Sequence, residues 1–325
     1  MRQYIAELGE KVLSGGQITY EEALALEKTS GADISFLVAY AAKIREVFHG
    51  NRVDLCSIIS VRTGKCGEDC AFCSQSSHHN TGLESSVNLD EENILARAKE
   101  VEAAGVHRFD LVASGIGYTF EDAEFQMILQ IFRRLKKETK LQLCACLGVI
   151  GEPEAVALKE VGVTRYNHNL ETAESYFPQI TTTHSYKTRE RTVLAVGRAG
   201  MEVCCGGVVG MGESFAQRVE LAVALRELAV DSVPINVLNP IPGTPLAEKK
   251  LLGPLESVKT MAMFRMVLPR PTIRFAGGRE ANLRSLQALG LSAGINGMLT
   301  GNYLTTKGQG IAADLTMLED VGLEW

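Results

Sequence analysis

The chain has 325 residues, of which 46% are hydrophobic and 22% are charged, so it can bury a large core and is not a disordered chain. Its 39 acidic and 33 basic residues give a formal net charge of -6 without a long Lys or Arg block, which argues against an extended nucleic-acid surface. No run of about 18 apolar residues and no apolar signal core is present, so we expect a cytoplasmic protein outside the membrane.

Apolar, strand-like runs alternate with helix-period segments along the chain. The predicted strands begin near Val53, His107, Leu141, Val163, Glu202, Val233, Thr272 and Ile295. Such alternation implies parallel pairing, and eight units over about 270 residues imply an α/β fold of the (β/α)8 TIM-barrel type. An open, doubly wound sheet is the alternative. Residues 1–45 are predicted to form an N-terminal helical extension, and residues 46–325 the barrel.

Residues typical of helix N-caps and apolar residues at helical spacing predict the helices between these strands. Asn88, with Glu91 three residues later, is a predicted N-cap, and Thr119 is another. The second helix places apolar residues on one face, namely Phe125, Ile128, Leu129, Phe132 and Leu135. Further helices are predicted over Ser214 to Val230, Leu255 to Val267 and Ala281 to Leu289.

Eight cysteines are the most informative residues, because a reducing compartment disfavours disulfides and leaves metal or redox chemistry. Cys66, Cys70 and Cys73 are spaced C-x3-C-x2-C directly after the first predicted strand, on a loop expected at the active rim of the barrel. Iron-sulfur clusters are usually held by four thiolates, so three can hold a 4Fe-4S cube and leave one iron open. A structural zinc site is the alternative, but it expects four closed ligands.

This triplet, with an aromatic residue before its last cysteine, resembles the radical S-adenosylmethionine (SAM) superfamily. The resemblance implies that the methionine end of SAM chelates the open iron. It further implies that one electron from the cluster cleaves SAM to a 5′-deoxyadenosyl radical, which abstracts hydrogen from an unreactive carbon. The triplet alone indicates a superfamily and not a reaction.

Four further motifs, in the expected order, are similar to the biotin synthase family. They are YNHNLET (166–172), GGVVGMGE (206–213), VPINVLNPIPGTPL (233–246) and RFAGGRE (274–280). The resemblance implies sulfur insertion between two saturated carbons of dethiobiotin, with one SAM used per C–H bond broken and no catalytic residue beyond the cofactors. It also implies an electron donor such as flavodoxin or ferredoxin, and a homodimer.

The resemblance assigns binding roles to residues on several strand ends. The residues expected to bind SAM are Asn169, Glu171, Arg189, Gly207 and Val209, and those expected to bind dethiobiotin are Asn167, Asn236, Thr305 and Thr306. Asn167 and Asn169 lie two apart on a strand, so they point the same way, and an amide both donates and accepts hydrogen bonds. The alternative for Asn167 and Asn169 is a buried pair of amides whose hydrogen bonds go to the backbone. The alternative for Arg189 is an ordinary exposed residue on the surface of a helix.

The chain departs from the family at the second cluster, a 2Fe-2S cluster regarded as the sulfur source. Family members hold it with three cysteines and an arginine. Cys144, Cys204 and Arg274 match three of these ligands, but Asp110 stands where the other cysteine is expected. Two additional cysteines accompany the matched ones, because Cys146 is two residues from Cys144 and Cys205 adjoins Cys204.

These extra thiols predict a rearranged auxiliary cluster of four irons, held by Cys144, Cys146 and one or both of Cys204 and Cys205. Residues two apart on a strand share a face, whereas neighbours do so only across a bulge. With three ligands, one iron can carry an extra sulfide that leaves without dismantling the cube. Arg274 is then a nearby cation or weak ligand, and Asp110 is a spectator or hydrogen-bond acceptor. The alternative is that Cys146 and Cys205 are apolar filler residues, as we expect for Cys56.

Two other classes of protein fit part of the pattern. A radical SAM rearrangement enzyme or hydrogenase-maturation enzyme shares the barrel and the triplet, but the motifs around Asn169 and Arg274 count against it. A non-catalytic iron-sulfur electron carrier or zinc-stabilised scaffold would not need polar residues on several strand ends.

Overall fold

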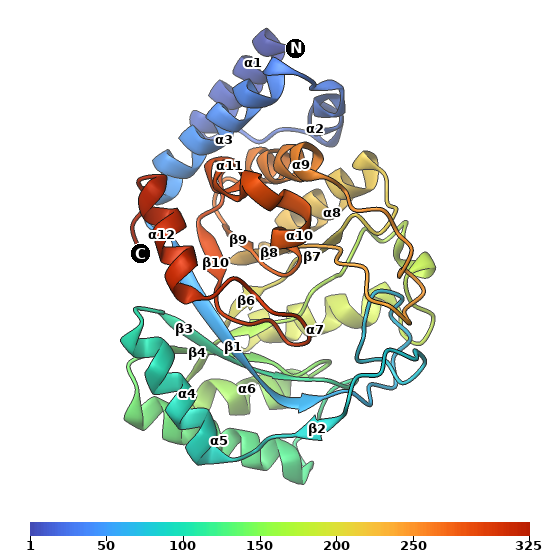
Figure 1. The fold of residues 1–325 in the computed structure, drawn as a ribbon, viewed down its shortest axis with the longest axis vertical. Coiled ribbons are helices and arrows are strands. Elements are labelled where there is room, and N and C mark those ends of the chain that lie inside the picture. Colours follow the sequence, from blue (N-terminus) through green and yellow to red (C-terminus); the bar gives the residue numbers. More distant parts are fainter.

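All eight predicted strands are present in the computed structural model, which describes residues 1–325. They are β1 (Asp54–Thr63), β3 (Arg108–Ala113), β4 (Gln142–Cys146), β5 (Val163–Asn167), β6 (Glu202–Cys204), β8 (Ser232–Val237), β9 (Thr272–Phe275) and β10 (Gly297–Leu299). The strands run parallel in the order β10-β9-β8-β6-β5-β4-β3-β1, and β10 pairs with β1 to close the ring (Figure 1). This closure confirms the (β/α)8 barrel and excludes the open sheet.

Two short strands were not predicted. β2 (Ser86–Val87) pairs antiparallel with the end of β1, and β7 (Gly207–Val209) pairs with β8 directly after β6. β6 and β7 therefore follow one another along the barrel wall with a break at 205–206.

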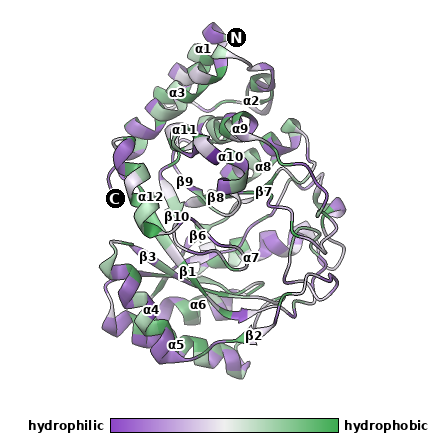
Figure 2. Cartoon of the chain, viewed as in Figure 1, coloured by the Kyte–Doolittle hydropathy of each residue, from purple (hydrophilic) through white to green (hydrophobic).

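Helices surround the barrel. They are α4 (Glu91–Ala103), α5 (Ala123–Glu138), α6 (Glu152–Glu160), α7 (Tyr186–Arg198), α8 (Phe215–Glu227), α9 (Pro254–Val267), α10 (Arg279–Leu283), α11 (Gln287–Ser292) and α12 (Ile311–Asp320). The predicted apolar face of α5 is buried, and Figure 2 shows hydrophilic and hydrophobic residues alternating along α4 and α5. The predicted helix over 281–289 is instead divided into α10, the 3-10 turn Arg284–Leu286 and α11. None of the helices is both long and apolar enough to cross a membrane.

Two of the predicted N-caps were wrong. Asp90, not Asn88, caps α4 by accepting hydrogen bonds from the backbone N–H groups of Glu92 and Asn93. The backbone N–H of Asn88 donates to Val61, because the chain is still adjacent to β1 there. Asp122, not Thr119, occupies the N-cap position of α5. Asx and hydroxyl side chains cluster before helices, and the sequence does not say which of them adopts the extended cap conformation.

The N-terminal extension consists of helices, as predicted. They are α1 (Arg2–Leu13), α2 (Tyr20–Ala25), the 3-10 turn Leu26–Lys28 and α3 (Ala32–His49). α3 thus continues four residues past the expected boundary at residue 45. Its apolar residues join the same hydrophobic core as residues of α9, and Figure 1 shows α1 and α3 beside α9 and α11.

A buried arginine ties α9 to the loop before β9. The Arg265 side chain donates hydrogen bonds to four backbone carbonyl oxygens, at Gly294, Leu268, Pro269 and Pro271, and to Asn296 Oδ1 at 2.6 Å. Its Nη1 also lies 3.3 Å from His49 Nε2, at the end of α3. The arginine is fully buried but has hydrogen-bond partners, so its burial is tolerated.

We expect His49 to make the free energy of unfolding depend on pH. Burial, and then the adjacent Arg265 charge, lower the pKa of His49 from 6.5 to about 4. Because the folded pKa lies below the unfolded one, this contribution is complete above pH 6.5 and is lost as the pH falls toward 4. After allowance for partial exposure it amounts to about 1 to 2 kcal/mol. Urea unfolding at pH 7 and pH 4.5 measures how much the free energy of unfolding falls between these pH values. The fall should be smaller for His49→Gln than for the natural chain, and an equal fall would contradict this.

Candidate active site

A cavity of about 360 Å³ opens at the carboxyl ends of the barrel strands, where active sites of such barrels lie. Most of the residues singled out from the sequence line it. Those are Cys73, Cys144, Cys146, Asn167, Asn169, Glu171, Cys204, Asn236, Arg274, Thr305 and Thr306. Side chains that are more than 230 residues apart in the chain therefore surround one space.

Cys66, Cys70 and Cys73 lie on the loop between β1 and β2, here called the cluster loop (residues 64–80). The loop is held by its own backbone, because Cys66 N–H donates to Gln75 O at 3.0 Å and Cys73 N–H donates to Cys70 O at 2.9 Å. His78 Nε2 and His79 Nε2 each lie 3.0 Å from a carbonyl oxygen of the same loop. Both histidines therefore brace the loop.

The three thiols of the cluster loop suit a polynuclear cluster better than a single ion. Burial raises the pKa of the Cys70 thiol to about 12 and that of Cys73 to about 11, so neither ionises readily alone. A bound metal centre would supply the positive charge that makes such thiolates stable. No three His, Cys, Asp or Glu side chains come close enough together to hold one metal ion, which counts against the zinc alternative. An iron-sulfur cube is larger and accepts ligands that are further apart.

Three of the residues predicted to bind SAM contact one another at the rim of the cavity, after β5. Arg189 Nη1, from α7, donates to the carbonyl oxygen of Asn169 at 3.0 Å and pairs with Glu171 at 3.2 Å. Asn169 Oδ1 accepts from Gly206 N–H at 3.1 Å. Glu171 has a φ of +70°, a left-handed conformation that is costly for a side chain with a Cβ and is found most often at functional sites.

The strand β7 packs against this rim. Val208 N–H donates to Glu171 O at 2.8 Å, and a Cβ at Gly207 would lie 2.4 Å from that oxygen, so only glycine fits there. Neither Gly207 nor Val209 lines the cavity. Val208 does so, whereas the Val209 side chain lies in the hydrophobic core. The SAM contacts expected at Gly207 and Val209 concern their backbone and stay predictions, whereas Val208 is the residue of β7 that faces the cavity, because neighbouring strand residues face opposite sides.

The auxiliary cysteines follow the alternation of the strands. Cys144 and Cys146 both line the cavity, as their spacing predicts, and Cys204 lines it as well. Cys205 does not. It is fully buried in the hydrophobic core on the same side of the strand as Val203, so we remove it from the candidate ligands.

Cys56 is buried, as expected of a core residue, but it faces the cavity and not the outer hydrophobic core. It lines the cavity from β1 together with Cys144, and its thiol donates to the carbonyl oxygen of Ser57 at 3.8 Å. The neighbouring Cys56 thiol and the charge of Arg165 together lower the pKa of Cys144. The alternation of β1, with Leu55 in the outer core and Cys56 and Ile58 inward, is the sequence signal that could have found it.

An ion cluster forms the floor of the barrel below these thiols. Asp54 Oδ2 accepts from Arg274 Nη2 at 2.9 Å, from Arg108 Nε at 2.9 Å and from Arg165 Nη1 at 3.2 Å. Burial opposes ionisation of Asp54, but the three guanidinium groups outweigh it and hold its pKa well below the usual range. Arg165 and Arg274 also line the cavity and place positive charge beside Cys144 and Cys204. Only Arg274 of these was predicted.

Two buried oxygen atoms face the cavity without a hydrogen-bond partner, Asp110 Oδ1 and Asn167 Oδ1. Burial, and then the adjacent Cys144, raise the pKa of Asp110 well above its usual value. Because buried polar atoms are normally paired, both oxygens suit a ligand that carries N–H donors. Asn236 differs, since its Oδ1 accepts from Gly277 N–H at 2.9 Å and its Nδ2 donates to Gly207 O at 3.3 Å.

The loop between β10 and α12 closes one side of the cavity with Thr305 and Thr306. Ser74 Oγ, next to Cys73, donates to Thr305 Oγ1 at 3.1 Å, so this loop contacts the cluster loop. The buried Arg279 anchors the other end by pairing with Asp314 at 2.7 Å.

Comparison with known proteins shows the family to which this chain belongs. The profile of the Radical SAM superfamily matches residues 60–225, and that of the Biotin and Thiamin Synthesis associated domain matches residues 234–324. The chain is 60% identical over 320 residues to a biotin synthase of Carboxydothermus hydrogenoformans, covering 98% of both chains. It is 51% identical over 321 residues to a biotin synthase of Clostridium acetobutylicum, covering 99% of this chain and 98% of the relative.

Solved structures share the fold. A methylornithine synthase superposes with a TM-score of 0.83 at 22% identity, covering 98% of this chain and 96% of the other. A maturase of the FeFe-hydrogenase superposes with a TM-score of 0.84 at 16% identity. The match covers 99% of this chain and 75% of the maturase. At such identities the likeness shows the fold alone.

Proposed function

The chain belongs to the biotin synthase family of radical SAM enzymes, and we propose that its barrel cavity inserts sulfur into dethiobiotin with a rearranged auxiliary cluster. SAM and a 4Fe-4S cluster are its cofactors. The single observation that carries the proposal is the meeting of two sets of thiols in one cavity. Cys73 of the cluster loop lies at the rim, and Cys144 and Cys204 lie near the arginines of the floor.

Cys66, Cys70 and Cys73 would hold the 4Fe-4S cluster, since they are the three thiols of the cluster loop. When bound together with SAM, the cluster supplies the one-electron chemistry that breaks unreactive C–H bonds. Asn169, Glu171 and Arg189 would bind the ribose and carboxylate of SAM, and the adenine would approach the backbone of β7, where Val208 faces the cavity.

The chain's own residues would position dethiobiotin between these two regions. Asn167 Oδ1 and Asp110 Oδ1 offer unpartnered acceptors to the N–H groups of a ureido ring. Thr305 and Thr306 offer hydroxyl donors to the carboxylate tail, and Asn236 would contribute to the ureido site by resemblance. Ile58, Val112 and Leu299 present apolar walls that exclude water.

The auxiliary cluster would contain four irons rather than two. Its three ligands would be Cys144, Cys146 and Cys204, and the Cys56 thiol lines the same cavity. With three protein ligands, the cluster would supply a sulfide that can be transferred without loss of the protein's own ligands. Arg274 and Arg165 offset the negative charge of such a cluster as nearby cations, and hydrogen bonds and charge at that distance also tune its potential.

Dethiobiotin is the substrate expected of this family. We further propose an electron donor such as flavodoxin or ferredoxin, a homodimer and a cytoplasmic location, all of which rest on the resemblance to the family.

Anaerobic incubation with SAM, dithionite and dethiobiotin tests the reaction. We expect biotin to form with two 5′-deoxyadenosine molecules per biotin, because two C–H bonds are broken. Measurement of both products by liquid chromatography decides between the alternatives. The absence of 5′-deoxyadenosine would mean that the chain is no radical enzyme, and 5′-deoxyadenosine without biotin would favour the rearrangement class.

A further inference from the structure

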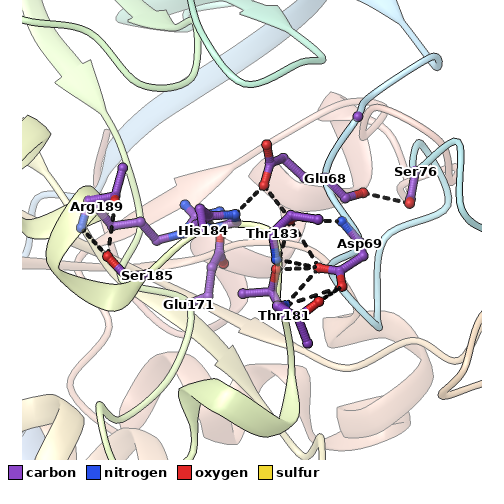
Figure 3. Close-up of polar contacts among 12 residues, drawn as sticks. Glu68, Asp69, Ser76, Glu171, Thr181, Thr183, His184, Ser185 and Arg189 are labelled. Atoms are coloured by element: carbon purple, nitrogen blue, oxygen red, sulfur yellow. Dashed lines mark hydrogen bonds and ion pairs between the residues drawn. The ribbon is translucent and has the colours of Figure 1, made fainter.

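A continuous polar chain joins the cluster loop to the arginine expected to bind SAM (Figure 3). Glu68, between Cys66 and Cys70, contacts His184 Nδ1. On the other side of the ring, His184 Nε2 lies 3.0 Å from Arg189 Nε. The side chains of Glu68, His184 and Arg189 are only 11%, 6% and 12% exposed, so bulk water does not screen these contacts.

The direction of the hydrogen bonds follows from the chemistry of the groups. The Nε–H of a guanidinium only donates, so His184 Nε2 must be the unprotonated, accepting nitrogen. The ring proton then lies on Nδ1 and is donated to the Glu68 carboxylate. Both ring nitrogens of His184 are therefore used, and the ring orientation is determined from both sides.

Arg189 is held at two of its three nitrogens. Nε donates to His184, and Nη1 donates to Asn169 O and pairs with Glu171. Nη2 has no hydrogen-bond partner within the chain and is free to donate to a ligand. A guanidinium binds a carboxylate best when its plane is already fixed, because its donors form a rigid fork.

The cluster loop and the start of α7 are also clamped by Asp69. Its carboxylate accepts a hydrogen bond from the hydroxyl of Thr181 (Figure 3). It also accepts from the hydroxyl and the backbone N–H of Thr182. The neighbouring Glu68 accepts from the Thr183 hydroxyl. Two consecutive acidic residues of the loop thus bind one four-residue segment, 181–184, so the loop and that segment are held together.

We propose that His184 is a positioning residue, which fixes the plane of the Arg189 guanidinium for the SAM carboxylate and sets its place relative to the cluster loop. This inference rests on the proposed role of Arg189 in SAM binding. A purely structural role for His184 would be packing, since its ring lies edge-on to Phe177 at a centroid distance of 5.7 Å. The test must therefore separate hydrogen bonding from packing.

The comparison uses His184→Leu, which keeps the packing volume but removes both hydrogen bonds, and His184→Gln, which keeps a donor and an acceptor. Reconstituted enzymes are analysed for iron, for SAM affinity by equilibrium dialysis, and for the change that SAM causes in the paramagnetic resonance spectrum of the reduced cluster. We expect His184→Leu to keep its iron but to bind SAM about tenfold more weakly, and His184→Gln to stay within about threefold of the natural enzyme. The KM for SAM should rise in His184→Leu while kcat at saturating SAM changes little.

Arg189→Gln distinguishes failure of this inference from failure of the proposed SAM site. If Arg189→Gln weakens SAM binding and His184→Leu does not, the positioning role is wrong and the SAM site stands. If neither variant weakens binding, the assignment of Arg189 is wrong. Loss of iron from His184→Leu would overturn the inference in another way, because His184 would then act on the cluster loop itself.

Discussion

The triple variant with Cys66, Cys70 and Cys73 all replaced by alanine is expected to form no 5′-deoxyadenosine and no biotin, and yet to keep about four irons per chain. The three thiols of the cluster loop are the only cysteines on that loop, so no other thiol there can replace them. The auxiliary thiols lie on β1, β4 and β6 and are untouched by the change. Iron and acid-labile sulfide analysis of protein reconstituted without oxygen measures the result. Two irons per chain would contradict the four-iron cluster.

Cys205 provides a matched control for the auxiliary site. Added to the triple variant, Cys144→Ala should remove most of the remaining iron, because Cys144 lines the cavity beside Cys56. Cys205→Ala in the same background should leave the iron content unchanged, since that thiol lies in the hydrophobic core. Equal losses of iron from the two variants would mean that the alternation of side chains along the strand does not decide which thiols bind the cluster.

Asp54→Asn is expected to lower the free energy of unfolding by about 3 to 5 kcal/mol, because it leaves buried guanidinium groups without their shared anion. Asp54 pairs with Arg108, Arg165 and Arg274, whose side chains are 5% to 9% exposed. Its lowered pKa means that this stabilisation is present above the ordinary value of 3.8 and is lost only in stronger acid. Denaturant unfolding at pH 7 measures the effect.

Asp33→Asn is the control for this change. Asp33 also pairs with an arginine, but its partner Arg2 is 62% exposed, so the expected loss is below about 1 kcal/mol. If both variants lower the free energy of unfolding by a similar amount, the buried ion cluster stabilises the fold no more than an exposed ion pair does.

The barrel itself was predictable because parallel strands and their helices repeat along the chain. Each strand needs an apolar outer face and each helix an apolar inner face, so both leave periodic patterns in the sequence. The same periodicity correctly placed Cys144 and Cys146 on one face and favoured only one of Cys204 and Cys205. Helix caps were predicted less well, since several Ser, Thr, Asp and Asn residues precede α4 and α5.

By itself, the sequence determined the class of chemistry and the repeating architecture of this protein, because the spacing of Cys66, Cys70 and Cys73 and the alternation of strands are local properties. The tertiary structure alone decided which distant residues meet. It brought Cys56 to Cys144, three arginines to Asp54, and His184 to both Glu68 and Arg189. These contacts depend on the register and closure of the barrel and on the path of its loops, which bring together residues that no short-range pattern relates.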